Sequence, residues 1–233
     1  MKTILSKYKE FLKSNYKLSF KSYNDLHSWS INSISDFWES IVKFFDIEFD
    51  QSPTTVYKFN DDFTKTLWFE NSKISYSKNV FKNHKLKTPA IKYQDENGNY
   101  IEVSWGSLKM KTLEFQKILV KNNVKIGDRV AGYCSNTPDV VAAFLAVNSL
   151  GAIWSSCSPD FGYDSVHDRF NQIQPKFLFY HSEYMYNGKI FSLDSKVEKL
   201  KSSIKSISYS LDLNTKSVFA NSKENINLTF TAV

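Results

Sequence analysis

The chain has 233 residues, of which 42% are hydrophobic and 16% aromatic, so it can bury a sizeable core, and this composition argues against global disorder. The formal net charge of +6 comes from 28 lysines against only two arginines, Arg129 and Arg169. Base recognition and bidentate phosphate clamping favour arginine, and no lysine cluster accompanies an RNA-binding aromatic motif. The charge therefore indicates solvated lysine faces and argues against a nucleic-acid partner.

The first 52 residues contain no glycine and show two amphipathic helical patterns. The second pattern opens at Ser33 or Ser35, followed by Asp36. Both apolar stripes should pack on something larger than the helices themselves. For residues 2–17 a lysine-rich opposite face leaves a membrane-surface helix as the alternative, although a docked helix is favoured. The apolar stripes consist of Ile4, Leu5, Tyr8, Phe11 and Leu12, and of Phe37, Trp38, Ile41, Val42, Phe44 and Phe45.

Residues 53–88 are expected to be irregular and to wrap the surface, with a helical turn near residues 76–83. Strands at residues 90–94 and 100–103 flank the turn 95–99, which is a strong hairpin signal. Ser104 then caps a helix whose apolar face comprises Trp105, Leu108, Thr112, Phe115 and Leu119.

The stretch 130–160 predicts a strand–helix–strand unit of a mostly parallel sheet. An uncharged strand at residues 130–134 precedes a helix start at 136–139, where a capping side chain, a proline and an acid follow one another. Gly151 closes the helix, and residues 152–156 form the next strand. The loop after it, from Ser158 to Gly162, lies where a parallel sheet takes a ligand.

The remaining third continues the alternation of helix and strand. We expect a helix from Asp164 or Ser165 to just before Pro175, a strand at 176–180, a polar aromatic loop at 184–189, a helix at 194–204 and a strand at 207–213. The last twenty residues show no clear element.

Sequence motifs for several chemistries are absent. There is no GxxxxGK[ST] or GxGxxG phosphate loop and no GxSxG nucleophile elbow. Cys134 and Cys157 are expected to be small buried hydrophobes, and no cysteine–histidine spacing fits a metal. His167 is expected to be polar helix surface, while His27, His84 and His181 have no partner that sequence identifies. With no signal peptide and no spanning segment visible, a soluble, cytoplasmic protein is expected.

Several blocks agree in order and spacing with one family. The chain resembles the adenylate-forming acyl-CoA synthetases, and within them the acetoacetyl-CoA branch. The resemblance covers about residues 26–205. The blocks that carry it are Gly127–Tyr133, Asn136–Val141, Leu150–Gly162 (LGAIWSSCSPDFG), Asp168–Phe170, Gln172–Lys176 and Tyr186–Lys189, with support from Phe37-Trp38, Phe44-Phe45, Trp68-Phe69 and Ser75-Tyr76.

The resemblance implies an α/β fold, namely an incomplete N-terminal adenylation domain with a mostly parallel sheet flanked by helices. Residues 1–85 would be the N-terminal helical and wrapping extension, and residues 86–233 the first α/β subdomain. It also implies a two-step ligase in which a carboxylate such as acetoacetate attacks MgATP, and the thiol of CoA then displaces AMP.

Three residues are carried over as CoA-side candidates. Phe161 and Gly162 match a loop near the pantetheine path, where they would supply an aromatic wall and a close backbone approach. The alternative is a plain turn with Phe161 in the core. Lys189 matches a basic position near the phosphates of CoA, with a solvated loop lysine as the alternative. For Arg169 an ion pair with Asp164 or Asp168 is expected.

No catalytic or metal-binding residue is assigned, because the family's phosphate loop, its acidic residues and its catalytic lysine match nothing before Val233. The chain is therefore expected to be a truncated N-terminal portion, inactive alone, with the remainder as a candidate partner chain. A non-catalytic module that binds CoA, an acyl-CoA or a partner is the alternative function. An open sheet edge predicts association and poor solubility.

Overall fold

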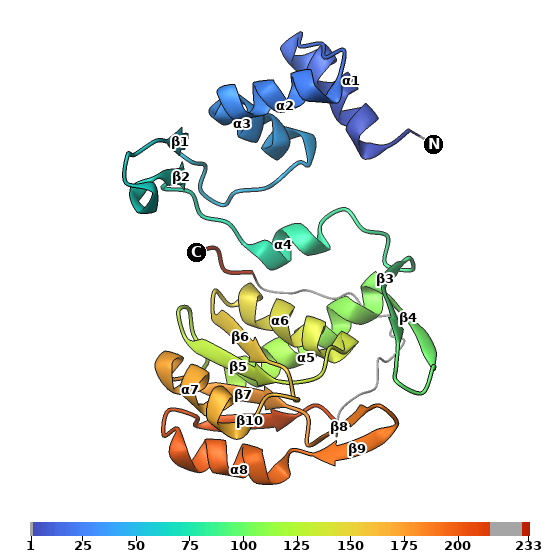
Figure 1. Ribbon diagram of the computed structural model, residues 1–233, viewed down its shortest axis with the longest axis vertical. Coiled ribbons are helices and arrows are strands. Elements are labelled where there is room, and N and C mark those ends of the chain that lie inside the picture. The colour runs from blue at the N-terminus through green and yellow to red at the C-terminus, as the bar shows by residue number, and fades with distance from the viewer. Residues whose placement is uncertain (1, 215–229) are drawn as a thin grey trace. The chain divides into compact units, whose positions relative to one another are not determined.

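A computed structural model describes residues 2–214 and 230–233, and the chain divides into two compact units, residues 1–74 and 75–233 (Figure 1). The first unit contains helices α1 (Ile4–Tyr16), α2 (Tyr23–Asn32) and α3 (Ile34–Phe44). They are followed by strand β1 (Thr55–Lys58), the 3₁₀ turn η1 (Phe63–Lys65) and strand β2 (Leu67–Glu70). The boundary that we expected at residue 85 concerns family domains and stays a prediction.

Helix α1 docks within the first unit through its apolar stripe. Tyr8 and Leu12 are buried together with Leu26 of α2, and the Tyr8 hydroxyl lies 2.6 Å from that of Ser40 in α3. Burial of Tyr8 and Leu12 supports the favoured docked helix over the membrane-surface alternative, although Ile4 and Leu5 of the same stripe are 65% and 43% exposed. Among the described residues no helix is long and apolar enough to cross a membrane.

Two elements of the first unit were missed by the sequence analysis. Helix α2 begins with a capping box, in which Ser22 Oγ accepts from the Asp25 N–H and the Asp25 carboxylate accepts from the Ser22 N–H. Residues 53–70, expected to be irregular, contain the antiparallel pair β1–β2, in which Tyr57 faces Trp68. Aromatic cross-strand pairs of this kind stabilise short hairpins.

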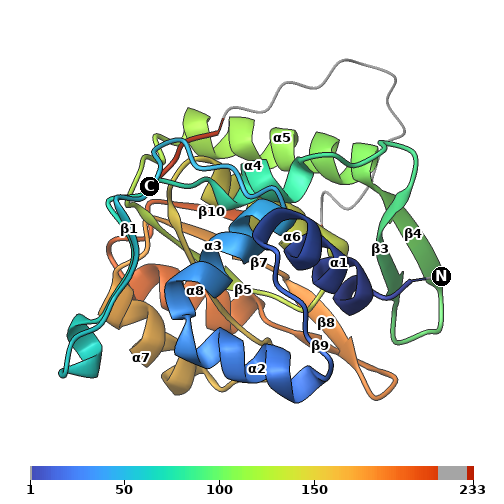
Figure 2. The ribbon, with the colours of Figure 1, turned by 90° about the horizontal axis from the view of Figure 1, so that it is seen from above.

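The second unit is built on a four-stranded parallel sheet with the order β10-β7-β5-β6. Its strands are β5 (Arg129–Tyr133), β6 (Ile153–Cys157), β7 (Phe177–Tyr180) and β10 (Tyr209–Asp212). Helices α5 (Trp105–Lys121) and α6 (Pro138–Ser149) lie on one face, and α7 (Tyr163–Ile173) and α8 (Asp194–Ser203) on the other (Figures 1 and 2). The predicted parallel α/β sheet flanked by helices is confirmed.

Smaller elements surround this sheet. Helix α4 (Tyr76–Phe81) falls at the predicted helical turn, and β3 (Pro89–Gln94) pairs with β4 (Tyr100–Ser104) as the predicted hairpin. A second hairpin, β8 (Glu183–Tyr186) and β9 (Lys189–Ser192), replaces the expected loop. Its turn is Asn187-Gly188, with φ of 49° and 71°, so the Asn-Gly pair is the signal that was overlooked.

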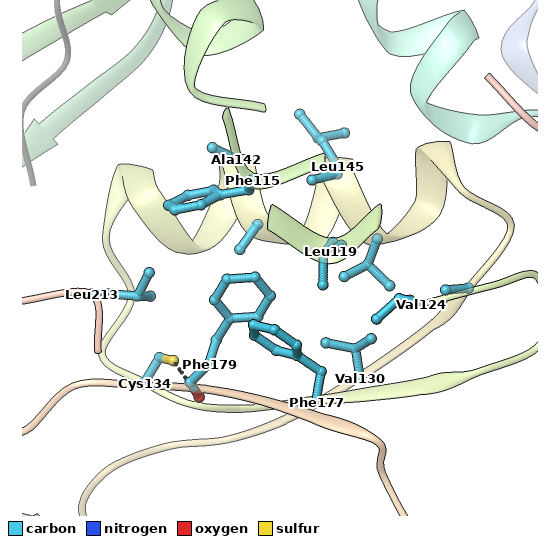
Figure 3. Packing of buried hydrophobic residues seen from close by; sticks show 14 of the residues in the cluster. Phe115, Leu119, Val124, Val130, Cys134, Ala142, Leu145, Phe177, Phe179 and Leu213 are labelled. Carbon is cyan, nitrogen blue, oxygen red and sulfur yellow. Dashed lines mark hydrogen bonds between the residues drawn. The ribbon is translucent and has the colours of Figure 1, made fainter. Parts of the chain in front are cut away.

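The larger core lies between the sheet and helices α5 and α6 (Figure 3). Phe115 of α5 and Phe179 of β7 are fully buried, with ring centroids 5.5 Å apart. Gly132 in β5 is required by close packing, because a Cβ there would lie 2.6 Å from the indole of Trp154. The expectation that Cys134 and Cys157 are buried is confirmed.

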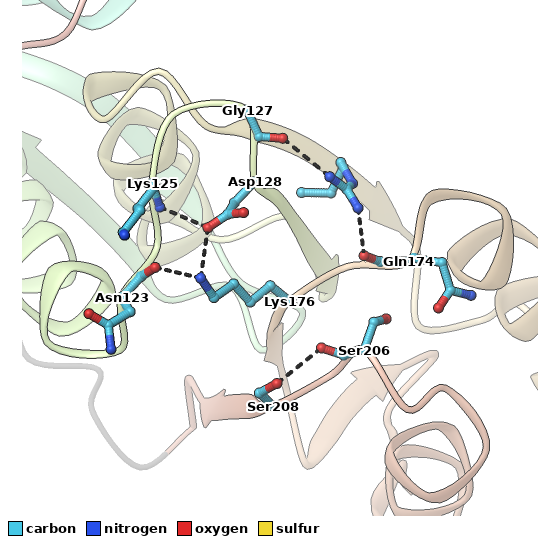
Figure 4. Close-up of polar contacts among 9 residues, drawn as sticks. Asn123, Lys125, Gly127, Asp128, Gln174, Lys176, Ser206 and Ser208 are labelled. Carbon is cyan, nitrogen blue, oxygen red and sulfur yellow. Dashed lines mark hydrogen bonds and ion pairs between the residues drawn. The ribbon is translucent and has the colours of Figure 1, made fainter.

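Polar groups close the amino-terminal end of the sheet (Figure 4). The Asp128 carboxylate accepts from the Lys125 N–H at 2.8 Å and from Lys176 Nζ at 2.9 Å, and the same ammonium reaches the Asn123 carbonyl. Arg129 donates from Nε to the Ile173 carbonyl, which ties the end of α7 to β5. Partial burial opposes ionisation of Asp128, but these hydrogen bonds outweigh it and lower its pKa.

Candidate functional site

The four parallel strands end at the same edge of the sheet, and the segments that follow them border a cleft of about 710 Å³. Ligands of open α/β sheets bind at this edge. The β3–β4 and β8–β9 hairpins complete the cleft. Its lining comprises residues 93–97, 101, 135–139, 158–160, 181, 183–186, 190, 213 and 214.

Tyr133, the last residue of β5, fixes the loop between β6 and α7. Its hydroxyl donates to the Phe161 carbonyl at 2.8 Å and lies 3.2 Å from the Pro159 carbonyl. Burial raises the pKa of Tyr133 to about 12, so the phenol keeps its proton and remains a donor. The predicted loop is therefore held from inside the sheet by a residue that the sequence analysis did not single out.

Phe161 is half-buried and packs on the core beneath α7 and α8. The guanidinium carbon of Arg169 lies 5.0 Å from its ring centroid, a cation–π contact. Among the described residues Arg169 makes no ion pair with Asp164 or Asp168, so the expected pairing was wrong. The partner of Arg169 is the aromatic ring of Phe161, which a search for opposite charges nearby in the sequence does not find.

Gly162 precedes α7 with φ of −64°, and a Cβ at this position would meet nothing within 4 Å. Neither backbone conformation nor packing within the described residues demands glycine here. An open backbone suits the predicted close approach of a ligand, which stays a prediction.

Lys189 is exposed at the start of β9, where it pairs with Tyr186 across the hairpin. The lining of the cleft includes its neighbour Ile190 and also Tyr186, but not Lys189 itself. Likewise Ser158, Pro159 and Asp160 line the cleft, whereas Phe161 and Gly162 follow them along the loop. Both predicted segments thus border one cleft, with the three candidate residues just outside its lining.

His181 is the polar residue of the site that sequence reasoning missed. It follows β7 directly, is only 6% exposed, and its Nδ1 accepts a hydrogen bond of 3.0 Å from the Ser135 N–H after β5. Burial lowers the pKa of His181, although the nearby Asp212 carboxylate opposes the shift. A partner 46 residues away in sequence left no local signal, but the position directly after a buried strand could have marked this histidine.

The charged side chains that line the cleft are all acidic. Its lining contains the acids Asp95, Glu96, Asp139, Asp160 and Glu183, and no lysine or arginine. Asp139 is buried at the start of α6, and Lys111 Nζ of α5 lies 3.8 Å from its carboxylate.

Helix α6 carries no side-chain cap, so the capping hydrogen bond that we expected from the residues before Pro138 is not formed.

His167 and His84 lie outside the cleft lining, and each stacks on an aromatic ring. His167 lies on α7 with its ring 5.5 Å from that of Tyr163, and His84 stacks on Trp105 at 3.6 Å. Across residues 2–214 and 230–233 no group of three or more His, Cys, Asp or Glu side chains is placed to hold a metal ion.

Comparisons with known proteins identify this architecture. The family model described as AMP-binding enzyme matches residues 78–229, and the model described as acetyl-coenzyme A synthetase N-terminus matches residues 23–80. The chain therefore belongs to the AMP-binding enzyme family. Within that family it is a homologue of acetoacetyl-CoA synthetases, which confirms the resemblance drawn from the sequence.

The relatives are considerably longer than this chain. It is 34% identical to acetoacetyl-CoA synthetase of Danio rerio over 88% of the chain and 30% of that protein, and 38% identical to that of Macaca fascicularis over 82% and 28%. The structure of acetoacetyl-CoA synthetase from Streptomyces lividans superposes with a TM-score of 0.87 at 26% identity, covering 97% of this chain and 37% of the other. The chain thus spans about a third of the proteins it matches.

Proposed function

We propose that this chain forms the N-terminal part of an acetoacetate–CoA ligase and serves the CoA side of the reaction. The observation that carries the proposal is the cleft at the carboxyl edge of the sheet, bordered by the two segments that the sequence resemblance assigns to the CoA side. The overall reaction would convert ATP, acetoacetate and CoA into AMP, pyrophosphate and acetoacetyl-CoA by way of an acyl-adenylate. Seven relatives at 32–38% identity are named acetoacetyl-CoA synthetase, and one at 29% is named malonamoyl-CoA synthetase, which favours acetoacetate as the acyl acid.

The roles of the three candidate residues come from the family resemblance, and their positions at the border of the cleft are compatible with these roles. Lys189 presents an exposed ammonium beside the cleft, where a point charge suits a phosphate of CoA. Phe161 and Gly162 form the outer part of the loop held by Tyr133, where a ring and an open backbone would flank the pantetheine arm. This sequence contains no phosphate loop to hold ATP and Mg²⁺. In the whole enzyme the remaining part would hold them.

Calorimetric titration of residues 1–233 with CoA tests this proposal. We expect measurable binding, weakened by Lys189→Ala and unchanged by Lys125→Ala, which removes an exposed lysine at the opposite end of the sheet. Absence of heat with CoA would refute the CoA-side role. An unchanged affinity of the Lys189→Ala protein for CoA would refute the role of Lys189.

An assay of pyrophosphate release separates the ligase from its alternative. With ATP and acetoacetate, residues 1–233 alone should release no pyrophosphate. Release by these residues would show that they contain the adenylating machinery. Binding of CoA without any gain in activity on adding the downstream part of a relative would instead favour a CoA-binding or interaction module.

A further inference from the structure

The imidazole of His181 is held in one orientation and one tautomer. Ser135 donates its backbone N–H to Nδ1 at 3.0 Å, so Nδ1 carries no proton. In a neutral imidazole the proton then resides on Nε2. Since burial lowers the pKa of this histidine, the neutral form is the one present near pH 7. Nε2 is consequently a hydrogen-bond donor and cannot serve as a base in this state.

This donor points to the cleft. His181 is more than nine-tenths buried, yet it belongs to the cleft lining. In the part of the chain that the structure describes, Nε2 forms no hydrogen bond, and it is not among the fully enclosed polar atoms that lack a partner. Nε2 therefore meets the open space of the cleft, where a ligand atom can accept its proton.

The surroundings determine which kind of acceptor fits. Five carboxylates and no cation line the cleft, so a phosphate or carboxylate ligand would be repelled. Apolar side chains from the β8–β9 hairpin, among them Tyr184, Met185 and Ile190, supply a wall for an uncharged chain. Amide N–H groups suit carboxylate acceptors, and an amide carbonyl suits a neutral N–H donor.

We propose that His181 donates from Nε2–H to an amide carbonyl of an uncharged, amide-containing ligand segment that occupies this cleft. The inference rests on the proposed function, because the pantetheine arm of CoA is the segment of that chemistry. It divides the ligand between two places: the uncharged arm lies in the acidic cleft, and the charged end lies outside it, toward Lys189.

Nitrogen-detected NMR on the unaltered chain provides the main test. Histidine labelled with ¹⁵N in residues 1–233 should show Nε2–H protonation for His181, and pantetheine should shift that signal. Adenosine 3′,5′-bisphosphate, which carries the charged end without the arm, should leave it in place. No shift with pantetheine, or an equal shift with the bisphosphate, would overturn the proposal.

Substitutions provide a second test. His181→Phe removes the donor and should weaken pantetheine binding about 5-fold, the value of one neutral hydrogen bond. His181→Gln retains a side-chain N–H donor and should recover most of the affinity. His167→Gln, on α7 away from the cleft lining, is the matched control and should change nothing. Equal loss in the Phe and Gln proteins would indicate a merely structural histidine.

Failure of this inference and failure of the proposed function give different results. If CoA binds and responds to Lys189→Ala while pantetheine leaves His181 unshifted, the CoA-side role stands and the role of His181 is wrong. If pantetheine shifts His181 but CoA binding ignores Lys189, the cleft takes an amide ligand and the placement of the phosphates is wrong.

Discussion

The two ends of the parallel sheet differ in how their polar groups are used. At the amino end Asp128 pairs with Lys176, and Lys176 and Arg129 donate to the backbone carbonyls of Asn123 and Ile173, so their polar atoms serve the fold. At the carboxyl end His181 offers a donor to open space, and carboxylates line a cleft. The polar groups at the amino end therefore stabilise the fold, whereas those at the carboxyl end are the ones that the proposed function assigns to a ligand.

The largest effect is expected from a substitution in the hydrophobic core, which supports both ends of the sheet. Phe179→Ala deletes a fully buried ring that contacts Phe115, Trp154 and Phe177, and should destabilise the protein by about 3–5 kcal/mol. Urea unfolding measures this free energy. Phe191→Ala is the matched control, because its side chain is 42% exposed and should cost far less. Equal losses would show that Phe179 is not a centre of packing.

The next effect concerns the carboxyl end. Tyr133→Phe removes the hydroxyl that donates to the Phe161 carbonyl and lies 3.2 Å from the Pro159 carbonyl, and it should cost about 1–2 kcal/mol. Amide exchange of residues 158–162 should speed up more than exchange elsewhere, and CoA affinity should fall. Tyr180→Phe is the control, since in the described structure its hydroxyl forms no hydrogen bond. If the loop were equally protected in both proteins, Tyr133 would not be its anchor.

The amino end should respond to acid. The pKa of Asp128 lies below its ordinary value of 3.8, so its stabilisation is complete above that pH and is lost as the pH falls through the lower, folded-state pKa. Asp128→Asn should flatten this part of the stability–pH curve. Lys176→Met should cost about 1 kcal/mol, and a double-mutant cycle should reveal coupling between the two side chains. Additive losses would deny the pairing.

The smallest effect compares lysines at the two ends. Lys189→Ala should weaken CoA binding about 2- to 5-fold, as expected for an exposed charge, and the loss should shrink at high salt. It should not alter pantetheine binding or thermal stability. Lys125→Ala should alter none of these. A loss of pantetheine affinity in Lys189→Ala would place this lysine at the uncharged arm. It would contradict the separation of the arm in the cleft from the charged end outside it.

The predicted association of the chain can be checked alongside these variants. Strands β6 and β10 are the outer strands of the sheet, and Ile153 on β6 is 52% exposed. We expect concentration-dependent association in analytical ultracentrifugation. A cooperative, monomeric melt across a wide concentration range would contradict it.

Local patterns predicted most elements of the second unit, because each is encoded by residues close together in sequence. Apolar periodicity and Pro138 predict α6, and the uncharged run at residues 130–134 predicts β5. The same local logic, applied to Ser22 with Asp25 and to Asn187-Gly188, would have found α2 and the β8–β9 hairpin. Residues 215–229, most of the stretch for which no element was expected, lie outside the described residues.

The sequence by itself determined the parallel α/β class, the family and the two segments that border the cleft, since these depend on short-range patterns and ordered motifs. Tertiary structure alone decided which side chains meet. Sheet pairing brings Ser135 to His181, the turn of β6 into α7 brings Phe161 to Tyr133, and α7 sets Arg169 over that ring. The first two contacts span 46 and 28 residues and depend on chain topology, which no local pattern encodes, and they fix the donor and the loop of the candidate site.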